Sequence, residues 1–247
     1  MALHVDIITL APEMWACMDA GVIGRAKASG LWTQSLWHLR DFAVRADKRV
    51  DDRAYGGGPG MVLAPAPLRR CLDHVTAQHP KKPLVIQMDP AGQALTADLA
   101  QQLSQHDALT ILCGRYEGID ARITEQYVDH CVSIGPYVLS AGDLPGMCLL
   151  DAVLRLRPGV LGNDLSAEQD SFTDGLLDYP HYTRPEHDAS GQVPSVLTTG
   201  HHADIQRWRR KMALGRTWQQ QPQQLIGQSL SEEDIRLLQA YINEQDR

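Results

Sequence analysis

The stretch Leu109–Asp120 reads LTILCGRYEGID, an apolar run followed directly by a loop with glycine on both sides of Arg-Tyr-Glu. Similar short apolar runs predict further strands at His4–Leu10, Leu31–Leu39, Leu84–Met88 and Cys131–Gly135. Helical patterns fall among them at about 64–78, 95–105 and 143–157. This alternation predicts an α/β fold, a parallel sheet with helices on both faces. Ligands of such sheets bind beyond the carboxyl ends of the strands, where glycine-rich loops follow in this chain.

The last third of the chain has a different pattern. Pro158-Gly159 ends the third helix, and residues 162–174 (GNDLSAEQDSFTD) are polar and without periodicity. Beyond them we expect no strands, a helix at 201–214, and a second helix that begins with a capping box at Ser231 and Asp234. The expected organisation is therefore an α/β domain at 1–161, a flexible linker at 162–174 and a small helical domain at 175–247.

Composition excludes several classes of protein. The 247 residues carry a net charge of −7, so a basic surface for nucleic acid would have to be local. Residues 200–218 supply one, with five Lys and Arg against a single acid. The five cysteines are scattered, and His201-His202 has no third ligand at metal spacing, so we predict reduced thiols and no metal site. Without a signal peptide or a long apolar run, the chain is expected in the cytoplasm, not in a membrane.

Two glycine-rich loops raise the question of a ligand. VDDRAYGGGPG at Val50–Gly60 lacks the lysine and the hydroxyl residue of a phosphate-binding P-loop, so we set nucleotide triphosphates aside. SIGPYVLSAGDLPG at Ser133–Gly146 has one charge in fourteen residues. Such a loop exposes amides and carbonyls that can bind the edge of an adenine between apolar side chains. A buried connection between a strand and a helix is the competing explanation.

Five long segments together resemble a known family. DDRAYGGGPGM, LCGRYEGID, SIGPYVLSAGDLPGM, SAEQDSFTDGLLDYPHYTRPE and HHADIQRWRRKMALGRTW occur in the order found in bacterial tRNA (guanine-N1)-methyltransferases, members of the knotted class of S-adenosylmethionine-dependent RNA methyltransferases. The resemblance covers essentially the whole chain. It implies a C-terminal trefoil knot in the α/β domain, a homodimer whose active site is shared between subunits, and methylation of N1 of guanosine 37 in tRNA. Fold rules alone predict no knot.

The resemblance also implies roles for individual residues. The methyl donor, S-adenosylmethionine, would be bound by Pro90, Gly114, Ile134, Gly135, Pro136, Tyr137, Val138, Leu139, Gly142 and Pro145. The chain departs from the usual family pattern at Pro136, which removes a backbone donor, and at Ala141, which has less freedom at positive φ than glycine. Asp143 stands where the family usually has glutamate.

The chemistry sets the expected catalytic residues. Guanine N1 carries a proton and is a poor nucleophile until it loses it, so a carboxylate is needed as base and a cation near O6 to stabilise the developing charge. By resemblance these are Asp170 and Arg155. Arg155 could instead simply meet the dipole at a helix C-terminus, and Asp170 could be an ordinary linker acid.

Substrate contacts complete the expectations. Glu117 and Asp178 are candidate contacts to the guanine or the cofactor, while Arg207, Arg210 and Lys211 are spaced to share one helix face and bind tRNA phosphates. Two other functions stay open at this stage. One is a non-catalytic RNA-binding protein, and the other is a knotted-class RNA methyltransferase that acts on a different RNA site.

Overall fold

The computed structural model describes residues 2–162 and 170–245. The chain divides into two compact units, Met1–Asp164 and Leu165–Arg247. Residues 163–169, which make up much of the predicted linker at 162–174, lie outside the described residues. Among the residues that are described, none of the helices combines the length and the apolar character needed to cross a membrane.

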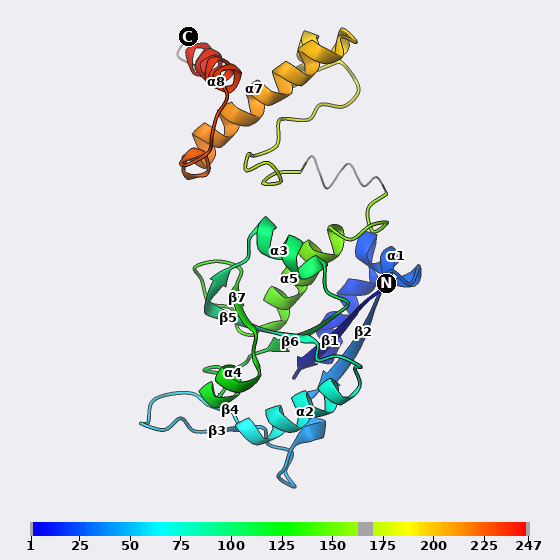
Figure 1. Cartoon of the computed structure of the whole chain (residues 1–247), viewed down its shortest axis with the longest axis vertical. Helices are drawn as coiled ribbons and strands as arrows, with labels where there is room; N and C mark the ends of the chain where they lie inside the picture. Colours follow the sequence, from blue (N-terminus) through cyan, green and yellow to red (C-terminus); the bar gives the residue numbers. More distant parts are fainter. Residues whose placement is uncertain (1, 163–169, 246–247) are drawn as a thin grey trace. The chain divides into compact units, whose positions relative to one another are not determined.

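The first unit is built on a five-stranded parallel sheet, as predicted (Figure 1). Its strands are β1 (Leu3–Thr9), β2 (Trp32–His38), β5 (Leu84–Ala94), β6 (Ala108–Cys113) and β7 (His130–Ser133), in the order β2-β1-β6-β5-β7. Only β5 differs clearly from the prediction, because it continues six residues beyond Met88. After an irregularity between Met88 and Gln93 it pairs with β7 again.

Helices cover both faces of this sheet. The odd-numbered residues of β1, including Val5 and Ile7, pack with a 3-10 helix (Pro12–Asp19) and with α1 (Gly21–Ala28), α3 (Ala97–Ser104) and α5 (Asp143–Arg155). On the opposite face Ile8 packs with a 3-10 helix (Leu39–Phe42) and with α2 (Pro65–Ala77) and α4 (Ala121–Tyr127). The two-residue period of the strands thus divides the core into two layers.

The Val50–Gly60 segment forms a small hairpin. Its strands β3 (Asp51–Asp52) and β4 (Val62–Leu63) pair antiparallel, and the glycines of the loop between them have positive φ. Backbone hydrogen bonds join the hairpin to the loop after β6: the Glu117 N–H donates to the Met61 carbonyl (2.9 Å) and the Leu63 N–H to the Gly118 carbonyl (3.0 Å). The hairpin therefore supports the loop that follows β6.

The second unit contains α7 (His202–Gln220) and α8 (Glu232–Gln245), with 3-10 turns at Ser195–Thr198 and Pro222–Leu225. Leu214 of α7 and Leu237 of α8 belong to its apolar core. The capping box is present, since Asp234 N–H donates to Ser231 Oγ and Ser231 N–H to Asp234 Oδ2. The expectation of no strands is wrong: β8 (His187–Asp188) and β9 (Gly191–Gln192) form a hairpin too short to leave a periodic pattern.

Candidate functional site

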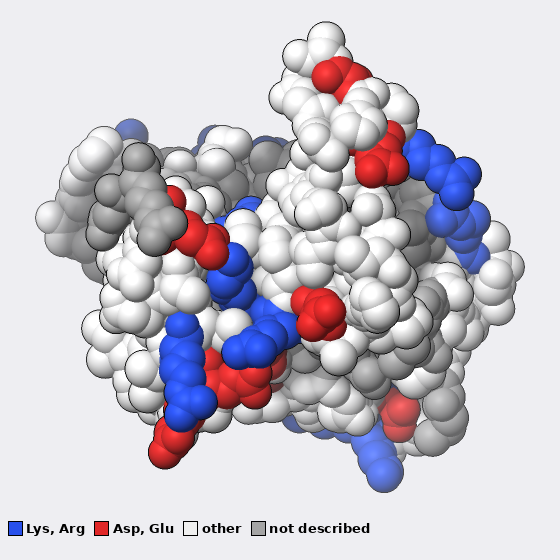
Figure 2. All heavy atoms as spheres, turned by 90° about the horizontal axis from the view of Figure 1, so that it is seen from above, with Lys and Arg blue, Asp and Glu red and all other residues white. Residues whose placement is uncertain are grey.

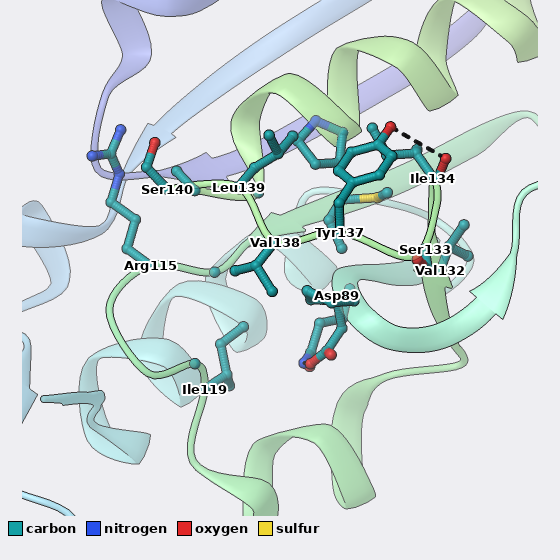
Figure 3. A pocket seen from close by; sticks show the side chains of 18 of the residues that line it. Asp89, Arg115, Ile119, Val132, Ser133, Ile134, Tyr137, Val138, Leu139 and Ser140 are labelled. Carbon is teal, nitrogen blue, oxygen red and sulfur yellow. Dashed lines mark hydrogen bonds between the residues drawn. The ribbon is translucent and has the colours of Figure 1, made fainter. Parts of the chain in front are cut away.

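A pocket of about 220 Å³ lies at the carboxyl ends of β6 and β7 and beside the irregularity of β5. Three loops surround it: the bend at Asp89-Pro90, the segment Gly114–Ile119 after β6, and the segment Ile134–Gly142 between β7 and α5. This is the position at which parallel sheets bind ligands. Figure 3 shows Ile134, Tyr137, Leu139 and Ser140 on one side of the hollow, with Ile119 and Asp89 on the other.

Backbone contacts fix two of these loops against each other. The Gly142 N–H donates to the Gly114 carbonyl (2.8 Å), and Arg115 forms an isolated β-bridge with Ala141. A Cβ at position 142 would lie 2.8 Å from the Gly114 nitrogen and 2.9 Å from the Cys113 Cα, closer than real contacts allow. Glycine is required here for close approach, because the φ of Gly142 is an ordinary −75°.

The loop after β7 exposes apolar side chains to this pocket. Tyr137, Val138 and Leu139 are 54%, 81% and 38% exposed, an unusual run of consecutive large apolar residues at the surface. The Tyr137 hydroxyl donates to the Ile134 carbonyl (3.4 Å), which holds the ring at the pocket (Figure 3). Apolar side chains beside the backbone of a loop suit a planar heteroaromatic ring.

Charged residues lie at the other boundaries of the pocket. Asp89 accepts hydrogen bonds from Gln87 Nε2 and the Ala91 N–H, both at 2.9 Å, and Glu117 packs against Gly60 of the hairpin. Arg115 forms an ion pair with Asp143, Nη2 to Oδ2 at 3.3 Å. These carboxylates give the pocket groups that can attract a cationic ligand.

Asp143 is fully buried at the start of α5. Besides Arg115 it accepts hydrogen bonds from Thr9 Oγ1 and Trp15 Nε1. Its hydrogen bonds therefore connect the start of α5 to β1, to the first 3-10 helix and to the loop after β6. The sequence did not predict this ion pair, although the glycines around Arg115 indicated a functional loop.

A thiol also lies next to the pocket but is not a nucleophile. Burial raises the pKa of Cys113 well above its usual value, and the charge of Asp143 raises it further. The thiol stays protonated near neutral pH, whereas the thiolate is the reactive form.

The structure groups most of the expected cofactor residues. All of them except Pro136 line the pocket, and Glu117 lines it too. Ala141 does not have positive φ, so alanine causes no backbone strain there. The backbone strain expected from alanine in place of glycine at this position is therefore absent.

The two expected catalytic residues belong to different units. Arg155 is the last residue of α5, about 18 Å along the helix from the pocket end at 1.5 Å per residue. Asp170 lies in the second unit, where it lines a separate hollow with Asp178 and Tyr179.

The hollow of the second unit has a polar and aromatic lining. Asp178 Oδ2 lies 2.7 Å from His181 Nε2, and the rings of His181 and Tyr179 have centroids 4.7 Å apart. The guanidinium of Arg209 lies 4.8 Å from the centre of the Tyr179 ring, while its buried Nε has no hydrogen-bond partner. Such a combination can bind a base and its phosphate.

The three expected phosphate contacts on α7 are all ion-paired. Arg210 bonds Asp234 (2.7 Å) and Asp174 (2.6 Å), Lys211 bonds Glu244 (2.7 Å), and Arg207 lies 3.5 Å from Glu233. Arg207 is 62% exposed, whereas the Lys211 side chain is only 17% exposed. Figure 2 shows Lys and Arg interspersed with Asp and Glu in its view. Arg210 and Lys211 thus have structural roles, and Arg207 is the most accessible of the three.

Comparison with known proteins gives a consistent result. The sequence profile of the family described as "tRNA (Guanine-1)-methyltransferase TrmD" matches residues 3–228. A tRNA (guanine-N(1)-)-methyltransferase of Coxiella burnetii (strain Dugway 5J108-111) is 50% identical over 244 residues, which is 99% of each chain. Proteins of the same name from Chromobacterium violaceum and Pseudomonas aeruginosa (strain LESB58) are 49% identical, covering 99% of this chain and 98% of their own.

Proposed function

The chain belongs to the tRNA (guanine-1)-methyltransferase family, and we propose that it transfers a methyl group from S-adenosylmethionine to N1 of guanosine 37 of tRNA. The resemblance seen in the sequence is thereby confirmed, and the enzyme class with it. The observation that carries the proposal is the match over residues 3–228, because it includes the pocket loops and the second unit as far as residue 228. Methylation at a different RNA site is not favoured by these relatives.

The pocket fits the proposed methyl donor. Backbone groups and apolar side chains of Ile134–Gly142 suit the adenine, and the carboxylates of Asp89 and Glu117 suit the positive charges of the methionine part. A bound sulfonium supplies an already activated methyl group. What the protein has to add is orientation of the methyl group and removal of the N1 proton.

Asp170 is our proposed base for that proton, and Arg155 the cation that stabilises charge at O6. Asp170 and Asp178 line the same hollow, which supports a site for the target base in the second unit. The guanine must leave its stack to reach such a site. Tyr179 and Arg209 would then contact the extruded nucleotide.

The position of Arg155 supports an active site shared between subunits. Because α5 separates it by about 18 Å from the pocket of its own chain, an Arg155 that acts at such a pocket would come from a second copy. A homodimer with C2 symmetry would form two such sites. We accordingly propose a homodimer that works on tRNA in the cytoplasm.

The remaining architecture follows from the family. We propose domains at 1–161 and 175–247 joined by a linker at 162–174, the second domain being a mostly helical one that binds tRNA. We also propose the trefoil knot, since the segment after β7 crosses beside the loop after β6 where Gly142 and Gly114 bond.

Nucleoside analysis tests the proposed reaction. Unmodified tRNA transcript incubated with the enzyme and S-adenosylmethionine should yield 1-methylguanosine after digestion. A matched transcript with adenosine in place of guanosine 37 should yield none. A methyl group on ribose, on another base, or on the control transcript would contradict the proposal.

A further inference from the structure

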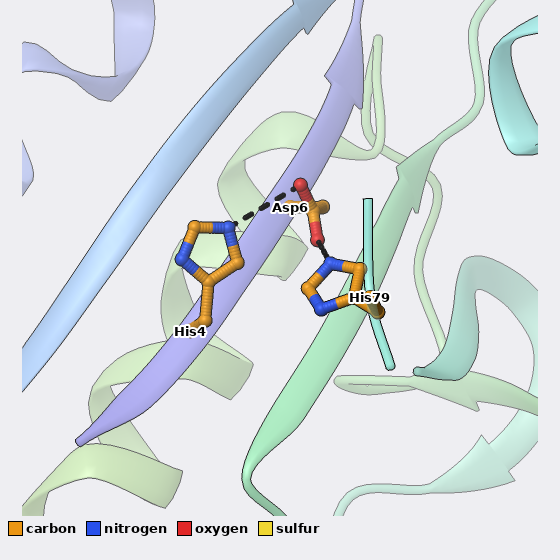
Figure 4. Close-up of side chains that lie close together, drawn as sticks. All are labelled: His4, Asp6 and His79. Carbon is orange, nitrogen blue, oxygen red and sulfur yellow. Dashed lines mark hydrogen bonds and ion pairs between the residues drawn. The ribbon is translucent and has the colours of Figure 1, made fainter. Parts of the chain in front are cut away.

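Two histidines and an aspartate meet on the sheet face that α2 covers. His4 and Asp6 come from alternate positions of β1, and His79 lies just after the end of α2 (Figure 4). Their ligand atoms all lie within 4.8 Å of one another. Sequence spacing could not show this cluster, because Asp6 and His79 are 73 residues apart.

The surrounding hydrogen bonds orient these donors. His4 Nδ1 lies 2.8 Å from Thr33 Oγ1, which directs Nε2 toward Asp6. Trp37 Nε1 donates to Asp6 Oδ1 (2.7 Å) and fixes the carboxylate, leaving Oδ2 toward His79. Metal-binding histidines and carboxylates are held in this way by a second set of partners.

The distances also suit a metal ion after a small adjustment. Bonds of about 2.0–2.1 Å in a tetrahedral site place ligand atoms roughly 3.3–3.5 Å apart. The two histidines face different oxygens of the carboxylate: His4 Nε2 is 3.5 Å from Asp6 Oδ1, and His79 Nε2 is at hydrogen-bond distance, 2.6 Å, from Asp6 Oδ2. His79 needs to withdraw by about 1 Å, and it follows the C-cap of α2, where the chain has left the helix.

The burial and the charge of Asp6 favour a bound cation. The Asp6 side chain is 1% exposed, and a carboxylate so deeply buried is stabilised by a positive partner. His4 remains 33% exposed, so water can reach the open side and complete the coordination. Ser35 Oγ, 3.2 Å from His4 Nε2, can hydrogen-bond such a water.

We propose that His4, Asp6 and His79 form a binding site for a divalent transition-metal ion, for which Zn²⁺ is the probe. Two imidazoles and one carboxylate match the ligands that Zn²⁺ accepts, whereas Mg²⁺ prefers oxygen alone. A metal ion bound there would connect β1 to the end of α2. His4 pairs with Ala108 at the start of β6, about 17 Å along the strand from the methyl-donor pocket. Its role is structural and independent of methyl transfer.

The experiment uses the full-length protein, stripped of metal by dialysis against a chelator. Calorimetric titration with Zn²⁺ should show one tight site per chain, and Zn²⁺ should raise the melting temperature by several degrees. His79→Gln should lower the affinity at least 100-fold and abolish the thermal shift. Thr33→Val, which leaves all three ligands in place, should weaken binding about 10- to 100-fold. Mg²⁺ should produce neither effect.

The control variant carries His201→Gln and His202→Gln, which remove the exposed histidine pair of the second unit. It should bind Zn²⁺ as the parent does. Binding that is unchanged in His79→Gln and Thr33→Val, or that disappears in the control, would overturn the proposal. The same holds if the parent shows no tight site, because the cluster is then a hydrogen-bond network alone.

Discussion

Gly142→Ala tests whether close backbone packing creates the proposed methyl-donor pocket. Alanine adopts the φ of −75° found at this position, so the substitution introduces no backbone strain. Its only effect is the added Cβ, placed 2.8 Å from the Gly114 nitrogen and 2.9 Å from the Cys113 Cα. Both neighbours are backbone atoms, which cannot swing aside as the end of a side chain can.

The size of the effect follows from these contacts. Ordinary contact begins at 3.4 Å, so the two loops must separate by about 0.6 Å. That movement would stretch the Gly142–Gly114 hydrogen bond from 2.8 Å to beyond its usual range. Loss of this bond costs about 1 kcal/mol, and overpacking typically costs about 1–3 kcal/mol. If most of this free-energy cost destabilises the ligand-binding conformation of the pocket, the affinity for S-adenosylmethionine should fall roughly 10- to 100-fold.

Calorimetric titration with S-adenosylmethionine measures this directly. Gly162→Ala is the matched control, because a Cβ there meets nothing within 4 Å and its φ is not positive. The control should bind like the parent, and Gly142→Ala should also melt at a lower temperature. Parental affinity in Gly142→Ala would refute the idea that this contact shapes the pocket.

Other variants test the second unit and the shared site. Hydrogen bonds from Arg210, the larger cause, and from Ser231 lower the pKa of Asp234 to about 2. Because the pair is partly exposed to solvent, these contacts should contribute about 1 kcal/mol above the unfolded pKa of about 3.8, and almost nothing below about pH 2. The melting temperature of Asp234→Asn should therefore lie below that of the parent at neutral pH and converge with it as pH falls; a gap that persists at pH 2 would exclude the ion pair as its cause. Arg207→Ala should weaken tRNA binding and reduce its salt slope by about 1 without affecting unfolding, whereas Arg210→Ala should lower the unfolding temperature. Equal behaviour of these two variants would contradict their division of roles. Leu139→Asp and Asp170→Asn should each be inactive alone. If subunits exchange between the two variants, up to about a quarter of parental turnover should return, because a mixed dimer would have one intact site out of two. No recovery would mean that both residues belong to the site of one subunit.

Local patterns in the sequence predicted the elements that depend on neighbours in the chain. Apolar runs such as Leu109–Cys113 became strands because their residues are buried on both faces of a parallel sheet. The uncharged segment Ser133–Gly142 became the pocket loop, and its small residue Gly142 permits close approach. The Ser231 capping box formed because its partner is three residues away.

Contacts between distant residues could not be predicted. Arg115 and Asp143 meet only once the loop after β6 reaches the start of α5. Nothing in the spacing of Arg210 and Lys211 indicates that carboxylates of α8 neutralise them, since those acids follow more than twenty residues later. A helical period identifies a shared face, but only tertiary packing decides what covers it.

Single-turnover methyl transfer by Asp170→Asn tests the central claim most directly. Asparagine keeps the shape of the side chain but cannot accept the N1 proton. With both substrates saturating, the rate of 1-methylguanosine formation should fall about 10²- to 10⁴-fold while binding of tRNA and S-adenosylmethionine stays near parental. A rate within a few-fold of the parent would mean that another group removes the proton, and Asp170 would be an ordinary surface acid.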